Sequence, residues 1–264
     1  MISVIIASYK NIKNLEIIFF ALKRQSFKNF EVIVAEDDNN SEMIDFLDIQ
    51  RNIYKYKIKH VNQPGDIGFR KNVILNKAIN IAEGDIIVFI DGDCIPHKHL
   101  LKIYAKNSGP NKILFGRRVM LSKKNSDKVL ETKNFRYLKF FYLLYYKSEK
   151  LRYSLYLPFF KIKKAAGIWG CNWSCMKKQI IEVNGFDEDF DKACFGEDTD
   201  IEWRLVANGN KLFSVRYSAI VYHLFHEKNY SRTESNESRR LMLEKKKQNI
   251  IFCKNGLKKI IDIG

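Results

Sequence analysis

Apolar runs and helical patterns alternate along the first hundred residues. The apolar runs occupy residues 3–7, 31–35, 58–61 and 85–90. The first run lacks polar–apolar alternation, which is typical of a strand buried on both faces of a parallel sheet. Between the runs, residues 14–26, 42–51 and 70–82 carry apolar side chains at helical spacing. This order predicts an α/β fold with a mainly parallel sheet and helices on its faces.

The second half of the chain has a less regular pattern. Residues 114–119 and 220–223 are predicted to be strands, and residues 177–183 and 198–208 helices. Residues 133–164 are predicted to be mostly helical, at least as far as residue 156. The tail from residue 229 is polar at first and then basic and helical. The length of 264 residues suits one large domain or two closely joined halves.

Polar residues stand where three of the predicted parallel strands end. They are Ser8 and Tyr9 after the first strand, Asp37 and Asp38 after the second, and Asp91, Gly92 and Asp93 after the strongest apolar run. Ligands of open parallel sheets bind at the carboxyl ends of the strands. We therefore expect these side chains to gather along one edge of the sheet.

The triplet Asp91, Gly92 and Asp93 suggests a metal site. Two carboxylates one residue apart can face the same divalent ion, and the glycine between them allows a tight turn. Oxygen ligands of this kind suit Mg2+ or Mn2+ bound to a diphosphate. Taken alone, however, the triplet is more typical of an ordinary turn after a strand.

Two further features suggest a nucleotide. A carboxylate from Asp37 or Asp38 could accept a hydrogen bond from uracil or ribose, although a solvated acidic loop is an equally good interpretation. Arg70 opens a helix after a glycine-containing loop, where it could meet a phosphate together with the helix N-terminus. By itself, Arg70 is more typical of a surface arginine.

The second half of the chain adds candidates for catalysis and metal binding. Glu197 and Asp198 open a predicted helix, where acids favour the helix dipole, but a carboxylate there could also act as a general base. His223 and His226 follow a strand and could complete a metal site with imidazole. A histidine pair of this spacing is more often structural.

The composition predicts an anionic partner and a cytoplasmic location. The net charge of +16 suits nucleic acid, a membrane surface or a phosphorylated substrate. Five cysteines without framework spacing indicate reduced thiols. The sequence has no apolar stretch long enough to cross a bilayer and no secretory pattern at residues 1–6.

Residues 133–164 carry much of this charge. They contain nine Lys or Arg, eleven Phe or Tyr and a single acid, Glu149. Such a stretch could stack nucleic-acid bases, dip into an anionic membrane surface, or pack in the core. Because the basic regions lie outside the acidic loops, we expect no nucleic acid at the site. A basic, aromatic-rich membrane-surface or nucleic-acid-binding protein without catalysis remains the alternative to an enzyme.

Taken in order, the motifs resemble those of the family 2 glycosyltransferases with the GT-A fold. The resemblance runs from residue 3 to about residue 257. Its matching segments are residues 3–9, 31–37, 68–70, 76–79, 82–85, 91–93, 170–174, 184–188, 196–200 and 222–226. The second half resembles the galactosyltransferase and chondroitin-polymerase branch, whose members carry a Gly-Glu-Asp motif and a late metal-binding histidine.

The resemblance implies a GT-A, Rossmann-like mixed sheet and a domain plan. Residues 1–100 would form the nucleotide-sugar-binding half, residues 101–228 the acceptor-binding and catalytic half, and residues 229–264 a basic helical tail. The implied activity is inverting, metal-dependent transfer of a hexose or N-acetylhexosamine from a UDP-sugar. The acceptor would be a surface glycan of the lipopolysaccharide or capsule type, free or lipid-linked. A peripheral position on the inner face of the membrane would suit an enzyme with such an acceptor.

The resemblance also implies roles for individual residues. The implied nucleotide-sugar-binding residues are Ala7, Ser8, Tyr9, Asp37, Asp38, Arg70, Asp91 and Gly92. The implied ligands of Mn2+ or Mg2+ are Asp93 and His223, with His226 as the substitute and Asp91 touching metal or ribose. Asp198 would be the general base, Glu197 would hold acceptor hydroxyls, and Asn172, Trp173 and Trp169 would line the acceptor side.

Two departures from the family pattern affect these roles. Asp38 stands where glycine is usual, so the base contact could move by one residue from Asp37. Residues 193–195 replace the usual Trp and Gly before the Gly-Glu-Asp motif. An aromatic side chain that stacks on the acceptor would then be Phe195 or Trp169.

Overall fold

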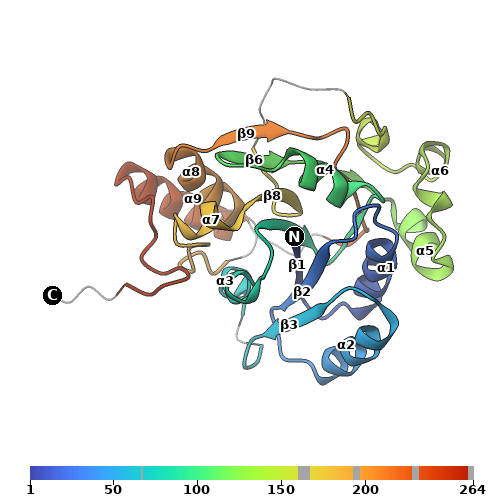
Figure 1. Ribbon diagram of the computed structural model, residues 1–264, viewed down its shortest axis with the longest axis horizontal. Coiled ribbons are helices and arrows are strands. Elements are labelled where there is room, and N and C mark those ends of the chain that lie inside the picture. The colour runs from blue at the N-terminus through green and yellow to red at the C-terminus, as the bar shows by residue number, and fades with distance from the viewer. Residues whose placement is uncertain (67, 160–166, 193–196, 228–231, 261–264) are drawn as a thin grey trace.

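The computed structural model describes the chain except for residues 67, 160–166, 193–196, 228–231 and 261–264 (Figure 1). A seven-stranded sheet forms the centre, in the order β3-β2-β1-β4-β8-β6-β9. Its strands are β1 (Ile2–Ser8), β2 (Phe30–Glu36), β3 (Ile58–Asn62), β4 (Ile86–Asp91), β6 (Lys112–Phe115), β8 (Asn172–Met176) and β9 (Lys211–Ser214). Only β8 runs against its neighbours β4 and β6. The predicted mixed, mainly parallel α/β sheet is confirmed, and strands from both halves of the chain build it.

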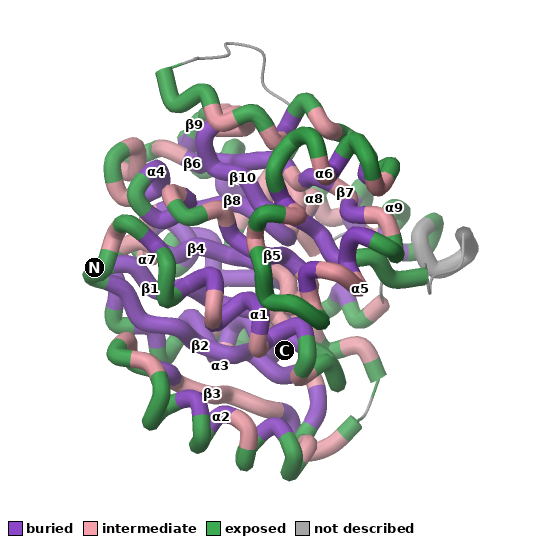
Figure 2. The backbone as a smooth tube through the Cα atoms, turned by 90° about the vertical axis from the view of Figure 1, so that its right-hand side faces the viewer, coloured by how far each residue is buried: buried purple, intermediate pink, exposed green. Residues whose placement is uncertain are grey.

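Helices cover both faces of this sheet. Alternate residues of β1 explain the pattern, because Val4 packs in one apolar cluster and Ile5 in the other. The first cluster includes side chains from α1 (Ile12–Lys23), α2 (Ser41–Ile53) and α4 (Leu100–Asn107). The second includes side chains from α3 (Lys71–Ile81), α7 (Lys177–Ile181) and α8 (Glu197–Ala207). The central strands are therefore buried on both faces, as Figure 2 shows for β1 and β2.

A second, three-stranded sheet lies beside the carboxyl end of β4. Its order is β5-β10-β7, with β5 (Cys94–Pro96), β7 (Arg117–Met120) and β10 (Ile220–His223). The single strand predicted for residues 114–119 is therefore wrong, since it consists of β6 and β7 in different sheets. The two strands separate at Gly116, where a Cβ atom would lie 2.2 Å from the carbonyl oxygen of Ala219. Only glycine allows the chain to pass this point.

Residues 133–156 are mostly helical, as predicted, but they do not form one continuous helix. The segment consists of the short helices η1 (Phe135–Leu138), α6 (Phe140–Tyr145) and η2 (Leu151–Ser154). Lys147 and Lys150 between α6 and η2 have left-handed backbones, each with φ of 56°, which end the helical path. Residues 160–164 of this stretch lie outside the described part of the chain.

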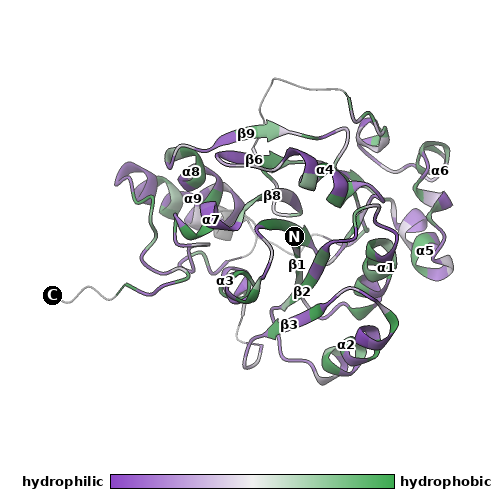
Figure 3. Cartoon of the chain, viewed as in Figure 1, coloured by the Kyte–Doolittle hydropathy of each residue, from purple (hydrophilic) through white to green (hydrophobic). Residues whose placement is uncertain are grey.

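Several short elements follow weak sequence patterns. They include β5, α4, β9 and α5 (Lys123–Thr132), none of which the hydrophobic pattern predicts. Most of α5 is hydrophilic, as Figure 3 shows, so it has no apolar stripe of the usual width. The basic tail does form a helix, α9 (Arg232–Lys247), as predicted. Of the helices that the structure describes, none is both long and apolar enough to cross a bilayer.

Candidate active site

A cleft of about 570 Å³ opens at the carboxyl ends of β1, β2 and β4. Its walls include Ala7, Ser8, Tyr9, Asp37, Asp91, Gly92, Asp93 and His226. The first strand brings Ala7 opposite Ala35 and Asp91, so the three strand ends meet in register. The structure thus brings together most of the residues that the sequence analysis assigned to the nucleotide sugar.

Gly92 lets the acidic turn lie directly against β1. Its backbone N–H donates to the carbonyl oxygen of Ala7 at 2.6 Å. A Cβ atom at Gly92 would lie 2.8 Å from that same oxygen and 3.2 Å from the Cα of Ser8. The close approach explains why a glycine separates Asp91 from Asp93, and it fixes both carboxylates at the cleft.

Asp37 is the carboxylate at the far end of the cleft. Its Oδ2 accepts a hydrogen bond of 2.8 Å from the backbone N–H of Arg70. Its Oδ1 is buried and has no hydrogen-bond partner among the described residues. Burial raises the pKa of Asp37 above its usual range, although the Arg70 hydrogen bond opposes the shift. A Gln63 side-chain hydrogen bond also opposes the shift.

Asp38 does not belong to the cleft wall. It is buried, its Oδ2 lies 3.9 Å from the Nζ of Lys10, and its carbonyl accepts from the backbone N–H of Gln63. Of the two neighbouring carboxylates, only Asp37 lines the cleft. The structure thus gives no sign that the base contact has moved from Asp37 to Asp38.

Tyr9 and Lys10 join the end of β1 to the loop before α3. The Tyr9 hydroxyl donates to Oδ2 of Asp66 at 2.8 Å, and the Lys10 Nζ donates to the same oxygen at 2.6 Å. Both Tyr9 and Asp66 line the cleft. Sequence analysis missed Asp66, since an acid in a loop carries no distinguishing pattern.

The cation at the cleft is Lys71, and the sequence analysis missed it. Arg70, which the sequence analysis placed near phosphate, is exposed and does not line the cleft, while Lys71 does. The Lys71 Nζ lies 3.0 Å from Oδ1 of Asp91 and 3.6 Å from Oε1 of Glu197. Burial lowers the pKa of Lys71, but these carboxylates outweigh it and hold that pKa above its usual range.

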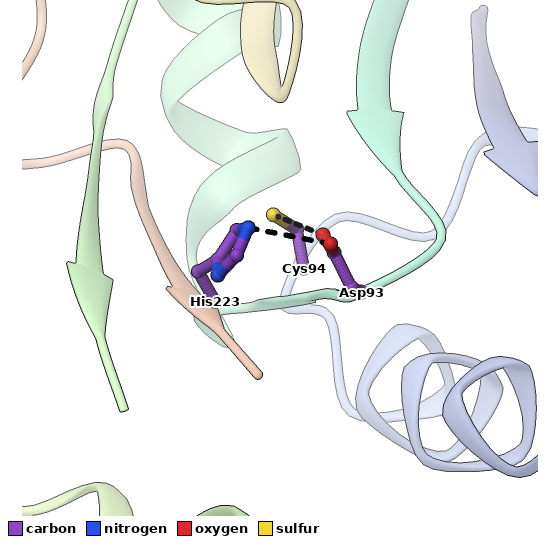
Figure 4. A group of neighbouring side chains, drawn as sticks. All are labelled: Asp93, Cys94 and His223. Atoms are coloured by element: carbon purple, nitrogen blue, oxygen red, sulfur yellow. Dashed lines mark hydrogen bonds and ion pairs between the residues drawn. The ribbon is translucent and has the colours of Figure 1, made fainter. Parts of the chain in front are cut away.

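Asp93 meets two histidines. The Nε2 atoms of His223 and His226 lie 3.3 Å and 3.2 Å from the same carboxylate oxygen, Oδ2. His223 reaches this position because β10 pairs antiparallel with β5, which sets His223 opposite Cys94 (Figure 4). The sequence analysis left open which histidine belongs to the site, and the structure places both against Asp93.

The electrostatics of this cluster suit a cation. Burial raises the pKa of Asp93, but its hydrogen bonds to His223 and His226 outweigh burial and hold the pKa well below its usual range. The hydrogen bond to Asp93 raises the pKa of His226 to about 9. Two imidazole nitrogens aimed at one carboxylate oxygen require either a proton on each nitrogen or a shared positive ion.

The donor set and spacing fit a divalent metal. Adjacent ligands at about 2.1 Å from an ion lie about 3.0 Å apart, which is close to the observed oxygen–nitrogen separations. Carboxylate and imidazole together suit Mn2+, and carboxylate oxygen also suits Mg2+. The structure therefore contains residues that fit the expected metal.

Cys94 lies beside the same cluster but is a poor ligand. Possible ligand atoms of Asp93, Cys94 and His223 lie within 4.8 Å of one another (Figure 4). The Cys94 thiol donates to Oδ1 of Asp93 at 3.2 Å, and burial raises its pKa well above the usual range. A thiol that keeps its proton does not bind metal well, so His226 is the better third ligand.

Glu197 and Asp198 form a second acidic centre. They line a small cavity that shares Ala7, Lys71 and Asp91 with the main cleft. The Asp198 Oδ2 accepts a hydrogen bond of 3.0 Å from the backbone N–H of Gly170. Burial raises the pKa of Glu197, and Asp198 adds to this effect while Lys71 opposes it.

Asn172 and Trp173 are buried in the protein interior, and Trp173 also lines the small cavity beside Glu197 and Asp198. The Asn172 amide accepts from the Tyr104 hydroxyl at 2.6 Å and donates to the carbonyls of Arg117 and Ala219. The Trp173 ring stacks on Phe89 with centroids 4.4 Å apart. Strand β8 turns both side chains into the core, so they support the site rather than face solvent.

Trp169 is the aromatic side chain that remains for the acceptor side. It is partly exposed and precedes Gly170, the hydrogen-bond donor to Asp198. The cationic groups of Arg117, Arg118 and Lys150 lie 4.5 Å, 5.3 Å and 4.8 Å from its ring centroid. Phe195, the other expected candidate, lies outside the described residues.

A mainly parallel sheet with one reversed strand, and an acidic turn at the end of β4, define a glycosyltransferase with the GT-A fold. The family model described as "Glycosyltransferase like family 2" matches residues 1–243. The chain therefore belongs to glycosyltransferase family 2. A search of curated proteins found no match to the chain.

Solved structures share this fold at low sequence identity. GalNAc-T7 in complex with UDP, GalNAc and Mn2+ has a TM-score of 0.65 and 11% identity, over 92% of this chain and 47% of that one. TarS from S. aureus has a TM-score of 0.60 and 17% identity, over 92% and 39%. The mannosyltransferase PcManGT from Pyrobaculum calidifontis, with GDP-Man and Mn2+, has a TM-score of 0.58 and 14% identity, over 94% and 64%. The chain thus spans less than two thirds of each of these proteins, and the predicted GT-A fold is confirmed.

Proposed function

We propose that this protein is an inverting, metal-dependent glycosyltransferase that moves a hexose or N-acetylhexosamine from a UDP-sugar. The acceptor is a sugar hydroxyl of a surface glycan. One observation carries the proposal: Asp93 and His226 line the main cleft, Glu197 and Asp198 line a small cavity that adjoins it, and Lys71 and Asp91 line both. A donor diphosphate and an acceptor hydroxyl need such a pair of centres.

The unpaired carboxylate oxygen of Asp37 favours uracil as the base of the donor nucleotide. The buried Oδ1 faces no donor among the described residues, and uracil offers an N3–H group. Leaving such an acceptor unpaired costs about 1–3 kcal/mol, which a nucleotide donor would recover. Related folds bind UDP-GlcNAc in TarS and GDP-Man in PcManGT, so the fold alone does not select the base.

Asp93, with His223 and His226, would hold the metal. A bound Mn2+ or Mg2+ offsets the negative charge that develops on the departing diphosphate. The partly buried ammonium of Lys71 adds a positive charge beside Asp91 in the cleft. Lys71 thus keeps the surrounding carboxylates from repelling an anionic donor.

Asp198 acts as the general base. It takes the proton of the acceptor hydroxyl while that oxygen attacks the anomeric carbon from the face opposite the diphosphate, which inverts the configuration. The Gly170 N–H fixes one carboxylate oxygen of Asp198 and leaves further lone pairs for the proton. Glu197 holds acceptor hydroxyls, and Trp169 supplies the apolar face on which a sugar ring stacks.

A panel of nucleotide sugars tests the proposal. The purified protein is mixed with UDP-, GDP- and dTDP-sugars, with Mn2+, Mg2+ or EDTA, and scored by thermal shift and by release of the nucleotide. We expect stabilisation and slow hydrolysis with a UDP-sugar and Mn2+, and neither with EDTA. Equal responses to every nucleotide, or a response that EDTA leaves unchanged, would contradict the assigned donor or metal.

A further inference from the structure

Helix α6 exposes large apolar side chains to solvent. Phe140, Phe141, Leu144 and Tyr145 are 36%, 80%, 55% and 74% exposed. Their spacing of i, i+1, i+4 and i+5 places all four on one face of the helix. Contiguous apolar surface of this kind marks interaction sites with proteins or membranes.

The opposite face of α6 already anchors the helix. Leu143 is fully buried and belongs to an apolar cluster with Leu138, Tyr153, Val119 and Tyr222 from the neighbouring elements. The core therefore uses the inner face alone. In the described part of the chain the outer side chains of Phe141, Leu144 and Tyr145 remain mostly exposed, so they are available to an external partner.

Basic side chains surround the exposed apolar face. The exposed basic side chains between residues 136 and 152 are Arg136, Lys139, Lys147, Lys150 and Arg152. Glu149 is the sole acid from residue 133 to residue 159. Leu155, Leu157 and Phe159 extend the apolar area, being 43%, 45% and 91% exposed. We call α6 and these flanking residues the aromatic–basic surface.

A basic groove of about 780 Å³ adjoins this surface, between α1 and η1. Its charged lining residues, in the part of the chain that the structure describes, are Arg24, Lys98, Lys133, Arg136 and Lys139. Glu16 pairs with Lys133 at 2.6 Å. The other four cationic residues keep the groove positive. Several cationic side chains that could bind phosphate groups therefore lie beside the exposed apolar face of α6.

We propose that the aromatic–basic surface docks on an anionic lipid bilayer. The aromatic side chains and leucines enter the headgroup region while the lysines and arginines, including those of the groove, meet lipid phosphates. A single-stranded nucleic acid fits less well, because it needs aromatic rings spaced along a groove for stacking. Leucines at the tip of the surface suit hydrocarbon rather than bases.

The surface lies next to the acceptor side of the cleft. Lys150, at its edge, places its Nζ 4.8 Å from the Trp169 ring, and Trp169 is followed by the Gly170 N–H that holds Asp198. A bilayer against α6 would bring the head of a lipid-linked acceptor to this side. This last step rests on the proposed function, whereas docking on the bilayer does not.

Vesicle co-sedimentation tests the apolar part of the surface. The probe is a vesicle with one third phosphatidylglycerol in phosphatidylcholine, compared with pure phosphatidylcholine. We expect binding to the anionic vesicle alone, and a loss of at least about tenfold for Phe141→Ser with Tyr145→Ser. The control is Ile49→Ser with Ile53→Ser, which removes apolar side chains that are 57% and 53% exposed from α2 and should bind like the wild type.

A second pair of variants tests the charge. Each cation near an anionic surface contributes about fivefold in binding, so Lys139→Gln with Lys147→Gln should weaken binding about 20-fold. Lys102→Gln with Lys106→Gln removes the same charge from exposed positions of α4 and should change binding little. Binding of the wild type should also fall as salt rises.

Three outcomes would overturn the proposal: no binding to the anionic vesicle, equal binding of surface and control variants, or binding to a single-stranded oligonucleotide that is lost in the same variants without vesicle binding. Stabilisation by UDP and Mn2+ is measured in every variant. Its preservation shows that the fold and the donor site are intact, so a failure of membrane docking is distinguishable from a failure of the proposed function.

Discussion

Asp198 and Glu197 are neighbours in the chain but have different surroundings. Asp198 is held by the Gly170 N–H, while Glu197 lies near Lys71 and burial raises the pKa of Glu197. A base must be ionised to accept a proton and must keep a free lone pair. These conditions favour Asp198 as the base and leave Glu197 to position the acceptor.

Replacing Asp198 by Asn should separate chemistry from binding. Loss of a general base costs about 100-fold or more in rate, so we expect transfer to fall by at least that much. UDP affinity, measured by calorimetry with Mn2+, should stay within twofold. Asp48→Asn, an exposed substitution on α2, is the control for loss of charge. Full turnover in Asp198→Asn would rule out the assigned base.

Replacing Lys71 by Met should affect both stability and donor binding. The change leaves Asp91 and Glu197 without their shared cation, and a charged hydrogen bond contributes about 1.5–3 kcal/mol. We expect weaker UDP binding by at least about tenfold and a lower melting temperature. Lys71→Arg should restore most of both. A donor affinity that is unchanged in Lys71→Met would show that Lys71 has only a structural role.

Lys71 also shows where prediction of single residues stops. The strand pattern located Asp37, Asp91 and Asp93, because strand ends in a parallel sheet share one edge. It favoured Arg70 and missed Lys71, because consecutive residues at a helix start point about 100° apart. The exact start of α3 settles which cation enters the cleft, and sequence patterns locate helix ends only to within a few residues.

At the scale of elements, the contact between β1 and the turn after β4 determines the shape of the cleft. Gly92→Ala would place a methyl group 2.8 Å from the Ala7 carbonyl and force the two segments apart. Overpacking of this kind costs about 1–3 kcal/mol, and UDP binding should weaken in parallel. Gly109→Ala is the control, since its added Cβ meets only ordinary contacts at 3.9 Å. Equal melting temperatures for the two variants would contradict this account.

The elements were predicted best where burial alone decides them. Continuous apolar runs gave β1, β2 and β4, because strands covered on both faces consist mostly of apolar residues. The pattern did not predict where the backbone changes direction inside a segment of uniform composition. Examples are Gly116 between β6 and β7, and Lys147 and Lys150 after α6. Lysine gives no sequence signal for a left-handed backbone, so the break in the helix was not visible.

At the scale of the whole molecule, ligands of the cleft should stabilise the fold. UDP with Mn2+ at 100 times its Kd should add about 2.7 kcal/mol to the free energy of unfolding. For a chain of this size that corresponds to a rise of about 5–10 °C in melting temperature. EDTA or Asp93→Ala should remove the metal-dependent part. A rise of the same size in Asp93→Ala would place the metal elsewhere.

His97 should make the molecule sensitive to acid. Burial, with nearby His99 and Lys98, lowers the pKa of His97 from 6.5 to about 4. Between these two pKa values the unfolded chain binds a proton at His97 and the folded chain does not. The free energy of unfolding therefore decreases as pH falls from about 6.5 to about 4. Between pH 7 and pH 5, the wild type should lose about 2 kcal/mol more than His97→Gln in urea unfolding. Parallel pH profiles for the two proteins would contradict this assignment.

The pairing of β5 with β10 has a consequence for biosynthesis. Asp93 leaves the ribosome with the first half of the polypeptide, but His223 arrives only after β8, α8 and β9 have been made. A nascent or truncated chain without β10 would carry the nucleotide-facing wall of the cleft and lack the imidazole that β10 brings to Asp93. Under the proposed function such a fragment would lack a metal ligand, so sugar transfer would begin only after β10 has paired with β5.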